Sequence, residues 1–411
     1  MKVLKQIFSP RRLLVWLFLI ILILTVPEIT RPSLSQTEAV VTMLCVEKNS
    51  DIIEVATTVL TPAQEKTPKY EVYKGVGKSI GEAVDSISLS IGKEMGFAQC
   101  EILGFGENIC DEGVITSLDF FTRTKRVGRN AVLINFTGEA DEFSQTVADL
   151  SMKKSLNLID VLNYDDRYVL IEDCNVEAFY KGYFSEISLG IMPQIKFEKQ
   201  ETDNAIQVQA TAGGSSSQEA GGSTSSAEQE KKYLVNDGTT LVFKNGKKHL
   251  DIEPEMVKKI NIFVNKAQEG IIRVENVADD LYDNSTVIIA VQEKEVKIKP
   301  KFEGNKPIYE VGVELTVLID EVINEQPDKN FLRRNKEFFT PELVKRAEET
   351  VTNNMNEAIA FCKENKIDMI DVYRYFYALK NKKFMQYYNQ EKENYLDNIE
   401  YKISVKIVND F

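Results

Sequence analysis

Hydrophobic residues between positions 70 and 143 recur with two different spacings that alternate along this segment. From Ser79 onward they come at steps of three and four residues, which predicts an amphipathic helix with Ser79 as its cap. Short apolar runs at 98–105 and 131–136 predict buried strands, and a helical pattern covers about 111–123 between them. Strands that alternate with helices of this length predict an α/β layer with crossover connections.

Regular alternation of apolar and polar residues returns further along the chain and predicts strands. A hairpin is predicted over 238–247, because Asn245 followed by Gly246 accepts the left-handed backbone of a two-residue turn. Longer alternating runs predict two more strands, at 285–302 and 308–319.

Two helices are predicted between these strands and a final strand at 401–407. Thr340 is expected to cap the first helix, with Pro341 at its first position, where a missing N–H is not needed. The second helix, around 372–388, is rich in Tyr and Phe. Such residues are also common at interfaces, but at helical spacing they more often pack a core, and we expect a core here.

These patterns predict a multidomain protein of the α/β and α+β classes, with mixed sheets and packed helices. The length of 411 residues allows two or three domains. We expect an N-terminal α/β domain at 36–160, a small middle domain at 161–255 and a C-terminal α+β domain at 256–411. Segment 200–232 is rich in Gly and Ser and has almost no apolar surface to bury, so we expect a flexible loop inside the middle domain.

Residues 1–35 are expected to attach the protein to a membrane or to direct its export. Four basic residues precede an unbroken apolar run from Leu13 to Val26, which has the length of a signal-peptide core and is short for a membrane span. The basic flank predicts a cytoplasmic N-terminus and an extracytoplasmic remainder. No small-residue cleavage site follows closely, which favours an uncleaved anchor over a cleaved signal peptide.

Three segments of the N-terminal α/β unit are distinctive as a set, namely 75–84, 100–106 and 118–123. Further on, a hairpin strand ends in Val-Phe-Lys, and a long helix is followed by Asp368, a second helix and a final strand. In this combination the chain resembles the Ger(x)C family, the C subunits of nutrient germinant receptors in endospore-forming bacteria. The resemblance covers most of 40–408.

This resemblance implies a non-enzymatic, membrane-tethered subunit on the outer face of the spore inner membrane, without a cofactor. It implies assembly with two integral membrane subunits, an A-type and a transporter-like B-type, in nutrient-triggered germination. The chain departs from the family in lacking a lipobox cysteine near Val26, so a protein anchor would replace the lipid. Two family glycines after Asp368 are replaced by Asp371 and Tyr373, and family tryptophans by other aromatic residues such as Tyr395.

Charge narrows the class of partner. With 50 basic and 63 acidic residues the formal net charge is −13, which argues against nucleic acid because its phosphates would be repelled. Within this acidic chain Arg123, Lys125, Arg126 and Arg129 form a basic cluster after the second predicted helix. We take it as the candidate partner-contact patch, since it suits an acidic partner or anionic lipid head groups; a solvated helix end is the alternative.

Groups for catalysis or metal binding are sparse, and we predict no catalytic, cofactor-binding or metal-binding residues. The one histidine, His249, has no second histidine or cysteine close in sequence. The Lys-Ser pair that ends at Ser79 lacks the upstream glycine of a phosphate-binding loop, because that position is Val72. The acidic pairs lack the spacing of a calcium loop and suit solvated turns. These pairs are Asp165-Asp166 and Asp279-Asp280.

Five cysteines have no metal-ligand spacing. A disulfide between Cys100 and Cys110 is conceivable in an exported protein, but burial as small hydrophobic residues is favoured. Two alternative functions remain open. An extracytoplasmic small-molecule-binding protein would need two similar lobes, and no repeat is visible; a cell-wall hydrolase would need paired catalytic groups.

Overall fold

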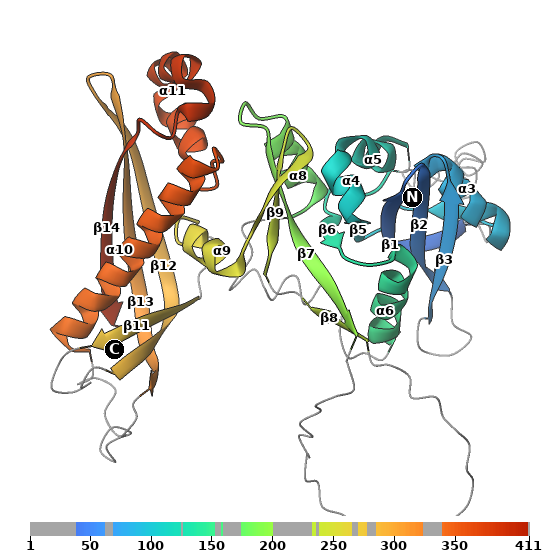
Figure 1. The fold of residues 1–411 in the computed structure, drawn as a ribbon, viewed down its shortest axis with the longest axis horizontal. Coiled ribbons are helices and arrows are strands. Elements are labelled where there is room, and N and C mark those ends of the chain that lie inside the picture. The colour runs from blue at the N-terminus through green and yellow to red at the C-terminus, as the bar shows by residue number, and fades with distance from the viewer. Residues whose placement is uncertain are drawn as a thin grey trace, which may run out of the picture.

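The computed structural model describes residues 38–61, 69–124, 126–152, 158, 174–199, 232–235, 238–264, 270–277, 285–323 and 339–409. This part contains a ten-stranded and a four-stranded sheet with helices packed on them (Figure 1). The predicted multidomain mixed α/β class is confirmed. The predicted membrane segment and residues 200–231 lie outside the described ranges, within which no helix is long and apolar enough to cross a membrane.

The ten-stranded sheet combines a parallel centre with antiparallel flanks. Its order is β10-β9-β7-β6-β5-β1-β2-β3, with β4 beside β1 and β8 beside β7; β1, β5, β6 and β7 are parallel neighbours. Strands from the predicted N-terminal and middle domains therefore pair in one sheet, and the boundary at residue 160 stays a prediction. The strands are β1 (Glu38–Asn49), β2 (Ile52–Thr61), β3 (Lys69–Gly77), β4 (Glu94–Gly96), β5 (Ile102–Phe105), β6 (Val132–Phe136), β7 (Leu189–Lys199), β8 (Lys232–Val235), β9 (Thr240–Lys244) and β10 (Lys247–Ile252).

Helices cover both faces of this sheet, because successive side chains of a central strand point to opposite faces. In β1, Leu44 and Val46 pack in one core and Met43 and Cys45 in the other. The helices α3 (Ile80–Ile91), α4 (Glu107–Glu112), α5 (Ile115–Asp119) and α8 (Val176–Tyr183) contribute to the first core, and α6 (Ala140–Met152) to the second. The result is a three-layer arrangement.

Close packing at the start of α3 explains two glycines of segment 75–84. Ser79 caps the helix as predicted, accepting a bond from the Glu82 N–H at 3.2 Å, while the Glu82 carboxylate accepts one from the Lys78 N–H at 2.8 Å. A Cβ on Gly75 would lie 2.1 Å from the Ala83 carbonyl oxygen, and one on Gly77 2.6 Å from Glu82 Cβ. The glycines therefore allow α3 to pack closely on β3.

Two predicted elements differ in the structure. The strand predicted at 98–105 begins only at Ile102, because the Cys100 N–H donates to the Phe97 carbonyl in a turn. The helix predicted at 111–123 is two short helices followed by a π-helical turn at Phe120–Thr124. Gly113, with φ of +124°, interrupts the helical path. In addition, β3 does not neighbour β5 but lies at the sheet edge beside β2.

In the described part of the chain, the helices that pack on the four-stranded sheet lie on one of its faces (Figure 1). Its order is β11-β12-β13-β14, with β14 parallel to β13 and the other pairs antiparallel. Figure 1 shows α10 lying along this sheet, and Thr340 caps α10 as predicted. The elements are β11 (Gly270–Val277), β12 (Ser285–Glu303), β13 (Lys306–Ile323), β14 (Glu400–Asn409), α9 (Pro254–Asn261), α10 (Pro341–Glu364) and α11 (Val372–Glu391), the last followed by a 3₁₀ turn at Lys392–Asn394.

The aromatic helix and the cysteines follow the sequence-based expectations. In α11, Tyr373, Phe376 and Phe384 are buried, which confirms the core prediction, whereas Tyr377 is half exposed. All five cysteines are buried thiols, and Cys100 and Cys110 form no disulfide with each other. Burial raises the pKa of the Cys100 thiol to about 12, which keeps it protonated.

Candidate functional site: a cleft between the two sheets

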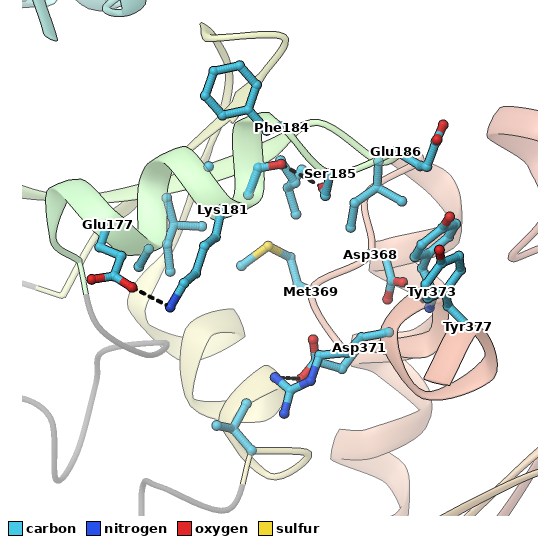
Figure 2. A pocket seen from close by; sticks show the side chains of 18 of the residues that line it. Glu177, Lys181, Phe184, Ser185, Glu186, Asp368, Met369, Asp371, Tyr373 and Tyr377 are labelled. Carbon is cyan, nitrogen blue, oxygen red and sulfur yellow. Dashed lines mark hydrogen bonds and ion pairs between the residues drawn. The ribbon is translucent and has the colours of Figure 1, made fainter. Parts of the chain in front are cut away.

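A cleft of about 1,110 Å³ lies between the α8–β7 segment and the turn that leads into α11 (Figure 2). Its two walls are close in space although their residues are almost 190 positions apart in sequence. The Tyr388 hydroxyl on α11 donates to the main-chain oxygen of Glu186 at 3.3 Å and so connects the walls.

The first wall is α8 and the start of β7. Asn175 caps α8 by accepting a bond from the Ala178 N–H at 2.9 Å, and Glu177 pairs with Lys181 at 2.8 Å along the helix. The helix returns into β7 at very close range. A Cβ on Gly182 would lie 1.8 Å from the Leu189 carbonyl oxygen. Glycine at this position therefore sets the distance between helix and strand.

The second wall is built around the buried carboxylate of Asp368, which is 6% exposed. Its oxygens accept bonds from the Val372 N–H at 2.9 Å, the Tyr373 N–H at 2.6 Å and the Tyr395 hydroxyl at 2.7 Å. Tyr309 adds a bond at 2.7 Å to the Ile370 carbonyl. Burial raises the pKa of Asp368, and these donors fix the turn at the start of α11.

Exposed aromatic residues lie at the mouth of the cleft, next to an arginine whose charge is paired with an aspartate. Phe184 is 76% and Tyr377 is 47% exposed, and Tyr377 stacks on Tyr373 with ring centres 5.6 Å apart. Arg374 pairs with Asp371 at 3.0 Å. Burial, with Glu186 nearby, raises the pKa of Tyr373 to about 12, so this phenol stays neutral. Aromatic area with polar tips is typical of surfaces that bind other proteins.

Comparison with known families identifies the chain. Residues 35–197 match the family model of the spore germination protein N-terminal domain, and residues 238–409 match the model described as spore germination B3/GerAC-like, C-terminal. The chain belongs to the GerAC-like family of spore germination proteins. The predicted resemblance to germinant-receptor C subunits is therefore confirmed, and with it a role of the family in spore germination.

A solved structure described as the crystal structure of the GerBC protein is similar over 90% of this chain and 97% of that chain, with 13% sequence identity and a TM-score of 0.48. Among curated proteins no significant match is found.

Two residues that the resemblance marks as replacements, Asp371 and Tyr395, belong to the second wall and its supporting bonds. Asp371 stands where the resemblance implies a glycine, and its φ of +60° is the left-handed conformation that glycine adopts at little cost. Tyr395, for which the resemblance implies a tryptophan, supplies the hydroxyl that binds Asp368.

The residues of the predicted basic cluster differ in their surroundings. Arg123 pairs with Asp119 at 2.7 Å on the preceding helical turn, whereas Arg126 and Arg129 are exposed and have no ion pair within the described residues. The Arg129 carbonyl accepts a bond from the Glu177 N–H at 3.0 Å, and the adjacent Asn130 lines the cleft. Arg129 therefore lies beside the first wall, and we call the exposed pair Arg126 and Arg129 the basic rim. Lys125 lies outside the described ranges.

The other chemical candidates stay apart from the cleft. His249 is exposed, with Nε2 3.3 Å from the Asn365 carbonyl oxygen. Both predicted acidic pairs, at 165–166 and 279–280, fall outside the described ranges. The sequence patterns did not reveal the cleft itself; the position of Asp368 before the second helix was the available signal.

A carboxylate cluster on the N-terminal sheet resembles a metal site but contains its own cation. Carboxylate oxygens of Glu54, Glu139 and Asp141 lie within 4.8 Å of one another. Lys74 pairs with Glu54 at 2.5 Å and with Asp141 at 3.3 Å. The lysine offsets one of the three negative charges and already binds two of the carboxylates. Glu47 lies beside this cluster.

Replacing Glu47 with glutamine is expected to stabilise the protein above neutral pH. Burial, followed by the charges of Glu139 and Glu54, raises the pKa of Glu47 from 4.5 to about 7. Its contribution to stability is therefore fully present below pH 4.5 and is lost as pH rises through 7. Allowing for partial exposure, Glu47→Gln should gain about 1–2 kcal/mol at pH 8. Urea unfolding at pH 5 and pH 8 measures this; an equal effect at both values would contradict it.

Proposed function

We propose that this chain is the extracytoplasmic C subunit of a nutrient germinant receptor and acts by docking, without catalysis. Its partners would be the integral membrane subunits, A-type and transporter-like B-type, and the chain itself would be held at the membrane by residues 1–35. The family membership supports the receptor role. The observation that carries the docking step is the cleft, with exposed Phe184 and Tyr377 at its mouth.

The chemistry of the rim favours one kind of occupant, an acidic polypeptide segment of a membrane subunit. Arg126 and Arg129 are exposed basic residues without ion pairs in the described part of a chain whose net charge is −13. An acidic segment would be steered to this rim, while aromatic side chains near it would supply contact area. A lipid head group would engage the arginines but leave the aromatic mouth unused.

Reversing both rim charges, Arg126→Glu with Arg129→Glu, is expected to reduce receptor assembly without unfolding the protein. Reversing two charges at the rim of an interface weakens the free energy of binding by on the order of a few kcal/mol. At exposed sites the same substitutions change the free energy of unfolding by under about 0.5 kcal/mol. Co-purification with the membrane subunits from dormant spores measures assembly. Germinant-triggered release of spore contents measures its consequence.

The matched control is Lys78→Glu with Lys93→Glu, which changes the net charge equally at the two ends of α3. Both lysines are exposed and neither forms an ion pair within the described residues. This control should assemble like the unmodified protein, and so should His249→Ala. Normal assembly by both the rim variant and this control would overturn the proposed docking site. Loss of assembly in both would overturn it too, because the loss would then be a general effect of charge.

A further inference from the structure

Helix α11 consists of two helical segments that meet at a kink. Lys380, with φ of −136° and ψ of 28°, leaves the helical conformation there. Phe376 and Phe384 lie on the two sides of the kink and stack in the core, with ring centres 5.1 Å apart. The segment between them is therefore held at both ends. Figure 1 shows α11 at one end of the four-stranded sheet, beside the turn between β12 and β13.

All seven residues between these two phenylalanines are exposed, from Tyr377 to Lys383. Tyr377 and Ala378 line the cleft, whereas residues 379–383, which we call the α11 corner, do not. Leu379 is 59% exposed although it is apolar. Only a surface outside the described part of the chain can remove this side chain from water, and doing so would be favourable.

The α11 corner is basic in an acidic protein. Segment 372–390 contains four basic residues and no acidic residue, whereas the net charge of the chain is −13. Lys380 and Lys382 are exposed and form no ion pair within the described residues. Lys383 donates to the main-chain oxygen of Gly304 at 3.2 Å, in the turn between β12 and β13. Three ammonium groups are therefore placed next to an exposed apolar side chain.

We propose that the α11 corner is a peripheral membrane contact that inserts Leu379 between the head groups of anionic lipids, while the lysines bind the lipid phosphates. Lysine stems pack along apolar surface and keep their ammonium groups at the level of the head groups. A projecting corner fits a fluid lipid surface without a matching hollow, which a folded protein would have to provide. This contact would set the orientation of the C-terminal sheet at the membrane, and it does not depend on the docking function.

A fluorescent probe at the corner tests this contact in the full-length protein reconstituted in vesicles. Asn381→Cys adds an exposed thiol, whereas the five native cysteines are buried, so a polarity-sensitive dye is attached at one site. In vesicles that contain phosphatidylglycerol, the emission should shift to the blue and be quenched by spin-labelled lipids. In vesicles of phosphatidylcholine alone, both effects should be weaker.

A control label reports on a distant part of the same sheet. Lys345 is exposed in the first turns of α10, and this helix begins at the far end of the sheet from α11 (Figure 1). The dye on Lys345→Cys should respond to neither lipid mixture. Equal quenching at both labelled positions would overturn the proposal, because the response would then not be specific to the corner.

Variants of the labelled protein test the charges and the apolar side chain separately. Lys380→Glu with Lys382→Glu should abolish the response to phosphatidylglycerol, since each lysine near an anionic surface strengthens binding by about fivefold. The matched control, Lys78→Glu with Lys93→Glu, should leave it unchanged. Leu379→Asp should reduce the quenching while shifting the melting temperature by less than about 2 °C, because the site is exposed.

Two further outcomes would overturn the lipid contact. The first is an emission at residue 381 that is equal in both lipid mixtures or unaffected by Lys380→Glu with Lys382→Glu. The second is a response that appears only when the membrane subunits are present, which would indicate a protein partner. The Arg126→Glu, Arg129→Glu protein should keep the lipid response, so this proposal and the docking proposal can fail separately.

Discussion

Replacing Asp368 with alanine is expected to lower the free energy of unfolding by about 3–4 kcal/mol, because three buried donors lose their acceptor at roughly 1 kcal/mol or more each. The donors are the N–H groups of Val372 and Tyr373 and the hydroxyl of Tyr395. For a unit of this size such a loss lowers the melting temperature by about 10 °C. Thermal and urea unfolding of the full-length protein measure both quantities.

A graded pair of variants checks that the effect comes from these bonds. Tyr395→Phe removes a single hydroxyl and should cost about 1–2 kcal/mol. Asp368→Asn keeps one acceptor oxygen and should fall between this variant and alanine. Because the carboxylate fixes the start of α11, Asp368→Ala should also impair assembly at the cleft. An alanine variant no less stable than Tyr395→Phe would show that the Asp368 carboxylate is not what holds the turn.

The elements that sequence patterns predicted correctly have strong local signals. Ser79 and Thr340 cap their helices, and Asn245 and Gly246 take φ values of +53° and +77° in the hairpin turn. Each of these features depends on residues within a few positions of one another, so the sequence displays the cause directly.

Features that depend on distant residues could not be predicted in the same way. The pairing of β6 with β7 joins strands more than fifty positions apart, and the register follows from packing on both faces of the sheet. The close return of α8 onto β7 has no periodic signature either. The sequence pattern missed the break at Gly113 because the surrounding apolar spacing continues across it.

In the candidate site, too, the features set by neighbouring residues were predictable and those set by distant residues were not. The basic cluster was visible as residues close in sequence, but the pairing of Arg123 with Asp119 removes one member from the unpaired rim. The cleft required Glu186 and Tyr388 to be brought together by the packing of the two sheets. Family order identified Asp368, although only the structure shows its three donors.

Replacing Gly182 with alanine is expected to destabilise the protein by about 3 kcal/mol, at the upper end of what an overpacked site costs. The new Cβ would lie 1.8 Å from the Leu189 carbonyl oxygen and 3.0 Å from its carbon, and both are backbone atoms that cannot rotate away. Helix α8 and strand β7 would have to separate. Since both elements line the cleft, assembly with membrane subunits should fall even at temperatures where the protein stays folded.

Gly128→Ala is the matched control, because a Cβ there meets no atom within 4 Å. It lies next to the basic rim and should change stability by less than about 0.5 kcal/mol. Gly182→Ala should lower the melting temperature by roughly 5–10 °C relative to this control. If the two variants melt together, the close approach of α8 to β7 is wrong, and the first wall of the cleft would need a different geometry. If Gly182→Ala melts lower yet assembles normally, the wall is structural and the docking surface lies elsewhere.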